Sequence, residues 1–149
     1  MKLGDYLAKD CVLPEIVSET RSDTLKELIA PLGAKYPEMD TDLAVRVLLE
    51  REKLGTTGIG DGIAIPHGKV DGLDAMHVIV GRSLKGVEYD ALDQKPCTIF
   101  FLVLAPEEAV GIHLRVLAQI SRLLKDETFR RSFLEAEGRD ELWGLLKSV

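Results

Sequence analysis

The sequence predicts a single α/β domain over residues 1–149, with a small mixed β-sheet and helices on both of its faces. The length suits one domain with one sizeable core, and 46% hydrophobic and 30% charged residues are ordinary for a globular protein. Segments with strand patterns alternate along the chain with amphipathic helical patterns. Residues 98–105 form a continuous apolar run of strand length, which is typical of a central strand covered on both faces.

The N-terminal part of the chain predicts one strand and one helix. Residues 1–10 are a short polar start. Residues 12–17 suit an edge strand, because Pro14 has no N–H to donate to a central ladder. Ser22 suits the N-cap of the helix that follows, and Pro31 is expected to kink or end that helix.

A second helix is expected between Asp40, a good N-cap residue, and Gly55, a natural residue just beyond a helix end. Its buried stripe is predicted to contain Leu43, Val47 and Leu54, with Ala44 and Leu48 beside it. Arg51 falls in line with that stripe, at the last turn. It either covers the edge of the core with its aliphatic stem or directs its guanidinium into the loop that follows, and spacing leaves both alternatives open.

The loop after this helix is rich in glycine, at positions 55, 58, 60, 62 and 68. Residues 63–65 form a short apolar run that suits a strand end or an extended segment, and Pro66 keeps the residue before it out of a helix. His67 follows, with only Gly68 on its other side. A histidine presented in this way can be a general base, a metal ligand or a nucleophile, and the alternative is a turn histidine without chemistry.

Two further strands are predicted in the middle of the chain. Residues 76–83 are rich in β-formers, with His77 near the start of that strand and its polar side outward. Residues 87–89 suit a short extended piece within a turn-rich connection. The central strand at 98–105 then follows, and Cys97 before it is expected to be a buried thiol.

The C-terminal third predicts three helices. Residues 111–113 open a long helix whose inner stripe is expected to contain Leu114, Leu117, Ile120 and Leu124. Asp126 suits the N-cap of a second helix to about residue 137, with Phe129, Phe133 and Leu134 facing inward. Residues 140–147 form a last amphipathic helix.

His113 lies near the start of the first of these helices, just after a strand. Backbone N–H groups at a helix N-terminus attract anions. His113 is therefore either a packing or capping residue, or a hydrogen-bond donor to an anion held at this end of the sheet.

The net charge, the length of the apolar runs and the number of cysteines argue against several classes of protein. A net charge of −6 argues against a nucleic-acid binder, which needs a basic patch. No apolar run approaches the ~20 residues of a membrane helix, so membrane insertion is not expected. The N-terminus has no apolar core of a secretory signal, and two cysteines give no disulfide framework. We therefore expect a cytoplasmic protein.

Residues 52–68 resemble the phosphorylation-site signature of the type-2 enzyme IIA domains, the fructose/mannitol family of the bacterial phosphoenolpyruvate-dependent phosphotransferase system. The matching positions are Glu52, Ile59-Gly60, Asp61-Gly62, Ile63-Ala64-Ile65, Pro66-His67 and Gly68. Residues 86–93 and the pair His113-Leu114 are similar to the nitrogen-regulatory branch of that family. The resemblance covers nearly the whole chain.

The resemblance implies a type-2 enzyme IIA fold and a phosphotransferase that carries a phosphoryl group on histidine. His67 is then the residue that accepts the group from the phosphohistidine of the histidine phosphocarrier protein. The family also has an arginine and a second histidine at the positions of Arg51 and His113, which are expected to supply charge and donors. The loop N–H groups of Gly60, Gly62 and Gly68 are expected to bind phosphate, and no metal or cofactor is implied.

The acceptor is expected to be a regulatory target protein, as in the nitrogen-regulatory branch, or a IIB subunit of a sugar-transport pathway. A chain without attached IIB or membrane segments fits the regulatory branch and fits a stand-alone sugar IIA equally. A weaker alternative is a metal site using His67 and His113, for which the sequence offers no clear third ligand. A nucleotide P-loop is not expected, because it has a Ser or Thr directly after its Gly-Lys pair and none follows Lys69.

Overall fold

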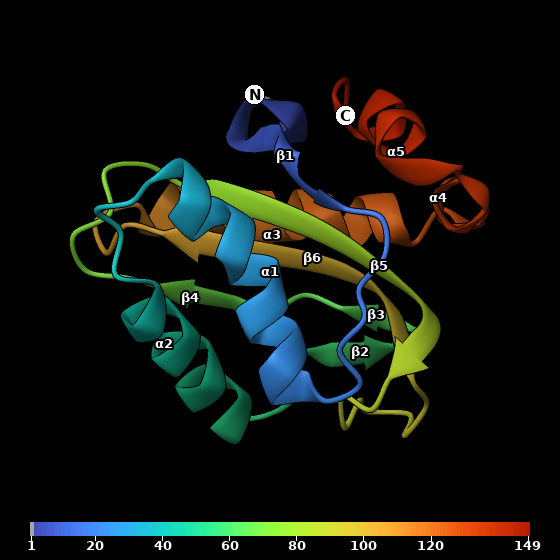
Figure 1. Ribbon diagram of the computed structural model, residues 1–149, viewed down its shortest axis with the longest axis horizontal. Helices are drawn as coiled ribbons and strands as arrows, with labels where there is room; N and C mark the ends of the chain where they lie inside the picture. Colours follow the sequence, from blue (N-terminus) through green and yellow to red (C-terminus); the bar gives the residue numbers. More distant parts are fainter. Residues whose placement is uncertain (1) are drawn as a thin grey trace.

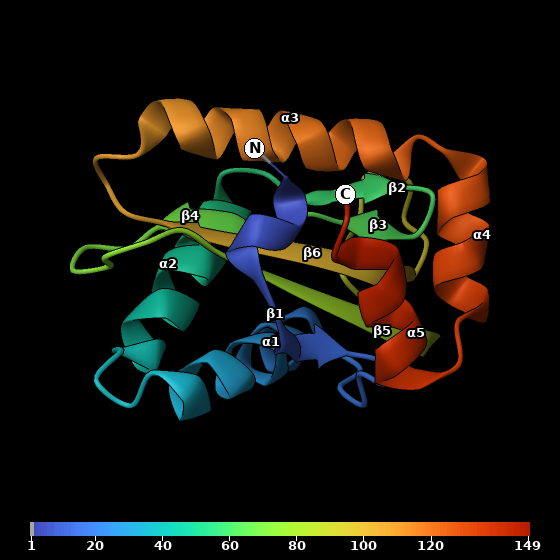
Figure 2. The same cartoon turned by 90° about the horizontal axis from the view of Figure 1, so that it is seen from above.

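The computed structural model describes residues 2–149. Over that range, one six-stranded mixed sheet lies between two layers of helices (Figures 1 and 2). Figure 2 shows helix α3 along one face of the sheet and helices α1 and α2 on the other. The predicted α/β fold, a small mixed sheet with helices on both faces, is confirmed.

The centre of the sheet is one buried strand, residues 97–105. The strands of the sheet are β1 (Leu7–Leu13), β2 (Gly58–Gly60), β3 (Ile63–Ala64), β4 (His67–Lys69), β5 (His77–Val87) and β6 (Cys97–Ala105), in the order β1-β5-β6-β3-β2. Strand β6 is antiparallel to β5, and β3 and β4 both pair with it in parallel, one after the other. The apolar run predicted as the central strand therefore takes that place.

Three of the α-helices begin at a residue whose side chain caps the first turn. The helices are the 3-10 helix η1 (Leu3–Tyr6) and the α-helices α1 (Arg21–Lys35), α2 (Thr41–Lys53), α3 (Val110–Leu124), α4 (Glu127–Glu135) and α5 (Gly138–Leu146). As predicted, the Asp40 side chain accepts the Leu43 N–H at the start of α2, and Asp126 caps α4. Among the helices of residues 2–149, none has the length and apolar character needed to cross a membrane.

The N-terminal expectations need correction. Strand β1 begins at Leu7, inside the stretch expected to be a polar start, and it ends just before Pro14, which cannot continue a ladder. Thr20 rather than Ser22 caps α1, and the helix continues past Pro31 to Lys35. The missing N–H of proline costs one hydrogen bond, and the burial of Leu28 and Leu32 on either side of it holds the helix together.

Apolar spacing predicts Ala44 and Leu48 beside the buried stripe of α2 and Ile120 and Leu124 in that of α3, and all four are buried. The two helices differ from the prediction at the end nearest His67. Leu54, beyond the end of α2, is 85% exposed, and the buried positions of α2 are Ala44, Leu48 and Glu52. In α3, Leu114 is 63% exposed, and the buried positions are His113, Val116, Ile120 and Leu124. At that end of each helix a polar side chain, Glu52 in α2 and His113 in α3, is buried in place of the predicted leucine.

The core has two halves, one on each face of the sheet, and β6 contributes alternate side chains to both. Phe101 and Val103 pack with α3, α4 and α5, whereas Phe100 and Leu104 pack with α1 and α2. Cys97 is a buried free thiol, as predicted.

A buried arginine ties the C-terminal helices to the sheet. Arg82 on β5 is 3% exposed, and its Nη1 donates to the carbonyl oxygens of Phe133 at 2.9 Å and Ala136 at 2.7 Å. Its Nε donates to the carbonyl of Pro14. These acceptors include the end of α4, where helix carbonyls lack partners and the helix dipole favours a cation.

Replacing Arg82 with Met should lower the free energy of unfolding by about 3 kcal/mol, because buried carbonyls then lose their donor. Urea-induced unfolding measures this change. Arg131→Met, which alters an exposed arginine of α4, is the control and should change stability by less than about 0.5 kcal/mol. Equal losses in the two variants would contradict the role of Arg82.

Candidate functional site

His67 is the first residue of β4, and its ring is half-buried beside the central strand. Its Nδ1 lies 2.8 Å from the carbonyl oxygen of Ile65. Because a carbonyl can only accept, Nδ1 carries the proton and Nε2 keeps a free lone pair. Burial lowers the pKa of His67, an effect that the Ile65 hydrogen bond opposes, so the ring is neutral near pH 7. The geometry thus leaves Nε2 as the nucleophilic nitrogen.

His113 comes from the first turn of α3 and lies next to His67. The two ring centroids are 5.7 Å apart and the planes meet at 73°, an edge-to-face arrangement. His113 is 5% exposed, and within residues 2–149 its buried Nε2 has no hydrogen-bond partner. Burial lowers the pKa of His113, and the charge of Lys69, or of His67 when it is protonated, acts in the same direction. This buried nitrogen of His113 is therefore available to bind a group that is attached to His67.

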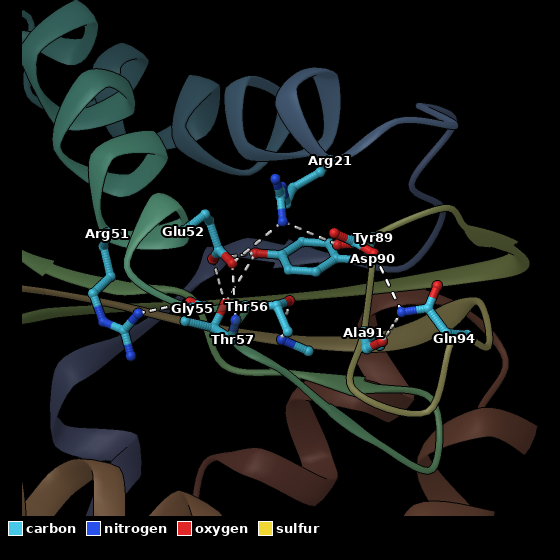
Figure 3. A network of polar contacts seen from close by, with 11 residues as sticks. Arg21, Arg51, Glu52, Gly55, Thr56, Thr57, Tyr89, Asp90, Ala91 and Gln94 are labelled. Carbon is cyan, nitrogen blue, oxygen red and sulfur yellow. Dashed lines mark hydrogen bonds and ion pairs between the residues drawn. The ribbon is translucent and has the colours of Figure 1, made fainter.

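Arg51 reaches the same place from the last turn of α2. Its Nη1 donates to the carbonyl of Gly55 at 2.8 Å, which fixes the guanidinium against the loop that follows the helix (Figure 3). The positive charge of Arg51 lowers the pKa of His67, while the negative charge of Glu52 raises it. Of the two alternatives that spacing left open, the structure supports a guanidinium directed into the loop.

A groove of about 430 Å³ joins these side chains. It is lined from three elements: by Val47, Glu50, Arg51 and Leu54 of α2 and its end, by His67, Gly68 and Lys69 of β4, and by His113 of α3. Strand β4 pairs with β6 on one side, so the groove lies along the free edge of β4, between the two helix layers. The structure therefore brings His67, His113 and Arg51 together.

Lys69 is a member of this groove that the sequence reasoning missed. It lies two residues after His67 on the same strand, so the two side chains leave the same face of β4. The two-residue spacing was the available signal, but it carries information only once residues 67–69 are known to be a strand. Lys69 adds a second cation to the site, besides Arg51.

Gly68 lies in the groove, but its contribution is steric. A Cβ at this position would lie 2.7 Å from Cγ1 of Val47, so the missing side chain lets α2 approach β4 closely. Val103 donates its N–H to Pro66 and Val70 donates to Ala105, which turns the N–H of Gly68, between them, toward β6. That N–H therefore faces the sheet, and the expected binding of phosphate by Gly68 gives way to a role in packing.

The structure does not bring Gly60 and Gly62 to the site, and their expected role in phosphate binding is corrected. Ile63 pairs with Ile99 on β6, whereas His67 pairs with Val103. Four residues along a strand separate the two positions by about 13 Å. Gly60 instead lines a different pocket, near the C-terminal end of α3.

These glycines serve a tight hairpin between β2 and β3. Asp61 and Gly62 are its two loop residues, and both have positive φ, of 56° and 78°. An Asp-Gly pair is a strong hairpin signal, because this kind of turn needs positive φ at both positions. The Asp93 carboxylate accepts the Asp61 N–H and holds the turn in place.

A buried polar cluster lies between the loop that follows α2 and the start of α1 (Figure 3). The Glu52 side chain, 1% exposed, accepts the backbone N–H of Thr57 at 2.8 Å and the hydroxyl of Tyr89 at 2.8 Å. The hydroxyl of Thr57 also donates to it, and Nη1 of Arg21 lies 3.8 Å away. Glu52 matched the family signature by sequence, but no role followed from that match.

Potential metal ligands do not gather in this site. Within residues 2–149, no three side chains of His, Cys, Asp or Glu are arranged to hold a metal ion. What the site offers is two neutral imidazoles, two cations and an open edge, which suits the binding and transfer of an anionic group.

Comparison with known proteins places the chain in a family. The model of the phosphoenolpyruvate-dependent sugar phosphotransferase system EIIA 2 family matches residues 5–149. The nitrogen regulatory protein of Bradyrhizobium diazoefficiens is 34% identical over 146 residues, which cover 98% of this chain and 95% of the relative. The fructose-specific EIIA component of Haloferax volcanii is 41% identical over 110 residues, which cover 74% of this chain and 71% of the relative.

A solved structure agrees with these relatives. The nitrogen regulatory protein IIA-Ntr of Neisseria meningitidis superposes with a TM-score of 0.89 at 28% identity, covering 97% of this chain and 98% of that one. Fold, signature and relatives agree over nearly the full length, and the chain belongs to the EIIA 2 family of the phosphoenolpyruvate-dependent sugar phosphotransferase system.

Proposed function

We propose that His67 accepts a phosphoryl group on Nε2 from the phosphohistidine of the histidine phosphocarrier protein. The observation that carries this proposal is the hydrogen bond between Nδ1 of His67 and the Ile65 carbonyl, which leaves the lone pair of Nε2 free in the groove. A new N–P bond forms at Nε2 as the N–P bond of the donor histidine breaks. The Ile65 carbonyl then stabilises the positive charge that attack places on the ring.

The neighbours of His67 supply what phosphoryl transfer requires beyond a nucleophile. The reaction depends mainly on in-line positioning and on stabilising charge on the phosphoryl oxygens. The guanidinium of Arg51 can donate paired hydrogen bonds to two such oxygens, and the buried Nε2 of His113 has no partner among residues 2–149. We assign both residues to holding the phosphoryl group, with Lys69 adding positive charge.

Protein partners would dock on the apolar surface around the groove. Leu54 is 85% exposed at the end of α2, and Leu114, Val110 and Ile112 are 63%, 45% and 39% exposed at the start of α3. Leu54 lines the groove that holds His67, and the other three are close in sequence to His113, which lines it from α3. Exposed apolar residues around a reactive group suit transient contact with a donor and then with an acceptor.

The nitrogen-regulatory branch supplies our leading assignment for the acceptor. Relatives named nitrogen regulatory protein match over nearly the whole chain, and the IIA-Ntr structure superposes closely. In this assignment, phosphorylated and unphosphorylated forms bind regulatory target proteins differently. The second candidate is a fructose- or mannitol-type IIA that passes the group to a IIB subunit, and the 41% identity to a fructose-specific EIIA component favours it.

His67→Ala should abolish labelling by the phosphorylated carrier protein, because the accepting nitrogen is gone. Labelling is followed by mass spectrometry after incubation with phosphoenolpyruvate, enzyme I and the carrier protein. His77→Ala is the matched control: His77 is half-buried against Tyr36, with ring centroids 5.0 Å apart, and its loss should leave labelling intact. Full labelling of His67→Ala would refute the assignment.

Arg51→Met and His113→Ala should each slow phosphorylation of His67 by about 10²-fold while leaving it measurable, because charge on the phosphoryl oxygens is then less stabilised. Rapid-quench kinetics with phosphorylated carrier protein give the rate constants. Arg46→Met, at an exposed position of the same helix, serves as the control. Rates equal to that of the control would remove the proposed roles.

Transfer from phosphorylated His67 to purified IIB proteins distinguishes the two candidate acceptors. The regulatory assignment predicts no transfer to fructose- or mannitol-type IIB proteins within the time in which the carrier protein phosphorylates His67. Isotope-labelled phosphate on each protein is measured after gel separation, and a known sugar IIA is the positive control. Rapid transfer to a IIB protein would favour the sugar-transport assignment instead.

A further inference from the structure

We propose that Glu52 is a positioning residue for phosphoryl transfer at His67, and that it acts through Thr57 and Ile65 to fix the imidazole in its reactive form. The proposal rests on the proposed function of His67. It gives a role to the buried acidic residue that begins the signature, which lies on α2 rather than on the strand that carries the histidine.

A continuous series of hydrogen bonds joins the two residues. Oε1 of Glu52 accepts the backbone N–H of Thr57 at 2.8 Å, and the carbonyl of Thr57 accepts the N–H of Ile65 at 3.0 Å. The carbonyl of Ile65 then accepts Nδ1–H of His67 at 2.8 Å. Each bond fixes the residue that makes the next one, so the position of the Glu52 carboxylate determines where the Ile65 carbonyl points.

The Glu52 carboxylate, where this series begins, has three neighbouring residues that fix its position. The Tyr89 hydroxyl donates to Oε2 of Glu52, and Thr57 binds Glu52 through both its N–H and its hydroxyl. The Arg21 guanidinium lies 3.8 Å from Oε1, donates to the carbonyl of Tyr89 and lies over its ring at 5.7 Å. Residues of α1, of the loop between α2 and β2, and of the segment after β5 thus hold one carboxylate in place (Figure 3).

This arrangement makes Glu52 suitable as an anchor. Burial raises the pKa of Tyr89 well above its usual value, and Glu52 adds to the effect, so the phenol stays protonated and remains a donor. A buried carboxylate that accepts several hydrogen bonds and faces a guanidinium has one preferred position. Because the hydrogen bonds follow one another, the fixed position of Glu52 also restricts the position of His67. A reacting nitrogen must be placed to well under 1 Å.

The charges around His67 give the proposal a second, electrostatic consequence. The groups that face the ring are Glu50, Arg51 and Glu52 from α2, Lys69 from β4 and His113 from α3. Burial and Arg51 lower the pKa of His67, whereas Glu52 and the Ile65 hydrogen bond raise it. Loss of the Glu52 charge therefore lowers the pKa of His67 further, and the imidazole stays neutral to a lower pH.

Glu52→Gln tests both consequences, because the amide keeps the size of the side chain and removes the charge. At pH 7.5, the rate constant for transfer from phosphorylated carrier protein should fall about tenfold. The acid limb of the pH–rate profile should move to lower pH. In the unphosphorylated variant, ¹⁵N NMR of labelled histidine should show a mixture of His67 tautomers, where the wild-type protein shows only Nδ1–H.

Glu27→Gln is the matched control. Glu27 is a part-buried carboxylate of α1 that accepts the N–H groups of Val17 and Ser18, so it does the same kind of structural work away from His67. Its loss should reduce stability without moving the acid limb or the tautomer ratio. Thr57→Val, which keeps the shape and the backbone donors but removes the hydroxyl held by Glu52, should slow transfer about threefold.

A folded Glu52→Gln protein with the wild-type rate and a pure Nδ1–H tautomer would overturn the proposal, and so would Thr57→Val with an unchanged rate. These results differ from a failure of the proposed function. In that case wild-type protein itself would not be phosphorylated on His67, while the tautomer measurement, which needs no phosphoryl group, would still report on the link to Glu52.

Discussion

The hydrogen bond from Nδ1 of His67 to the carbonyl of Ile65 is the interaction on which the site depends. It selects the tautomer, leaves Nε2 with its lone pair and orients the ring toward the groove. It can form because Pro66, with its fixed φ, turns the chain between the two residues while its carbonyl still accepts from Val103 on β6. The register of one short strand against the central strand therefore sets the chemistry of the imidazole.

The surrounding elements meet at this point because β4 has a free edge and a glycine. Helix α2 comes close to the strand only because Gly68 has no side chain in the way of Val47. Helix α3 approaches the other face and places the ring of His113 5.7 Å from that of His67. The site is thus assembled from three elements across two helix layers, and its residues are 51, 67, 69 and 113 in the chain. Close packing, rather than a flexible loop, fixes their relative positions.

Much of the fold and part of the site could be predicted from the sequence. The apolar run of β6, the caps Asp40 and Asp126, and the position of His67 between proline and glycine all follow from local chemistry. The burial of Glu52 and His113 could not be predicted, because apolar spacing favours Leu54 and Leu114 at those ends of α2 and α3. Glycine density also misled: Gly60 and Gly62 serve an Asp-Gly hairpin about 13 Å along the strand from His67. Local pattern cannot show which glycine meets a ligand and which makes a turn.

The burial of a polar side chain rather than a leucine on each of these two helices has a physical explanation. Burying Glu52 and His113 is unfavourable in a small core unless each is paired, and only Glu52 is fully paired within residues 2–149. The leucines at the surface are Leu54, which lines the groove, and Leu114, which follows His113 in α3; a partner protein bound at the groove would cover Leu54. The end of each helix nearest His67 therefore has a polar group on its buried side and a leucine on its exposed side. A carrier that must hold an anion and also bind protein partners transiently needs polar groups near the anion and apolar groups on the surface. Each helix supplies one of each at its end nearest His67.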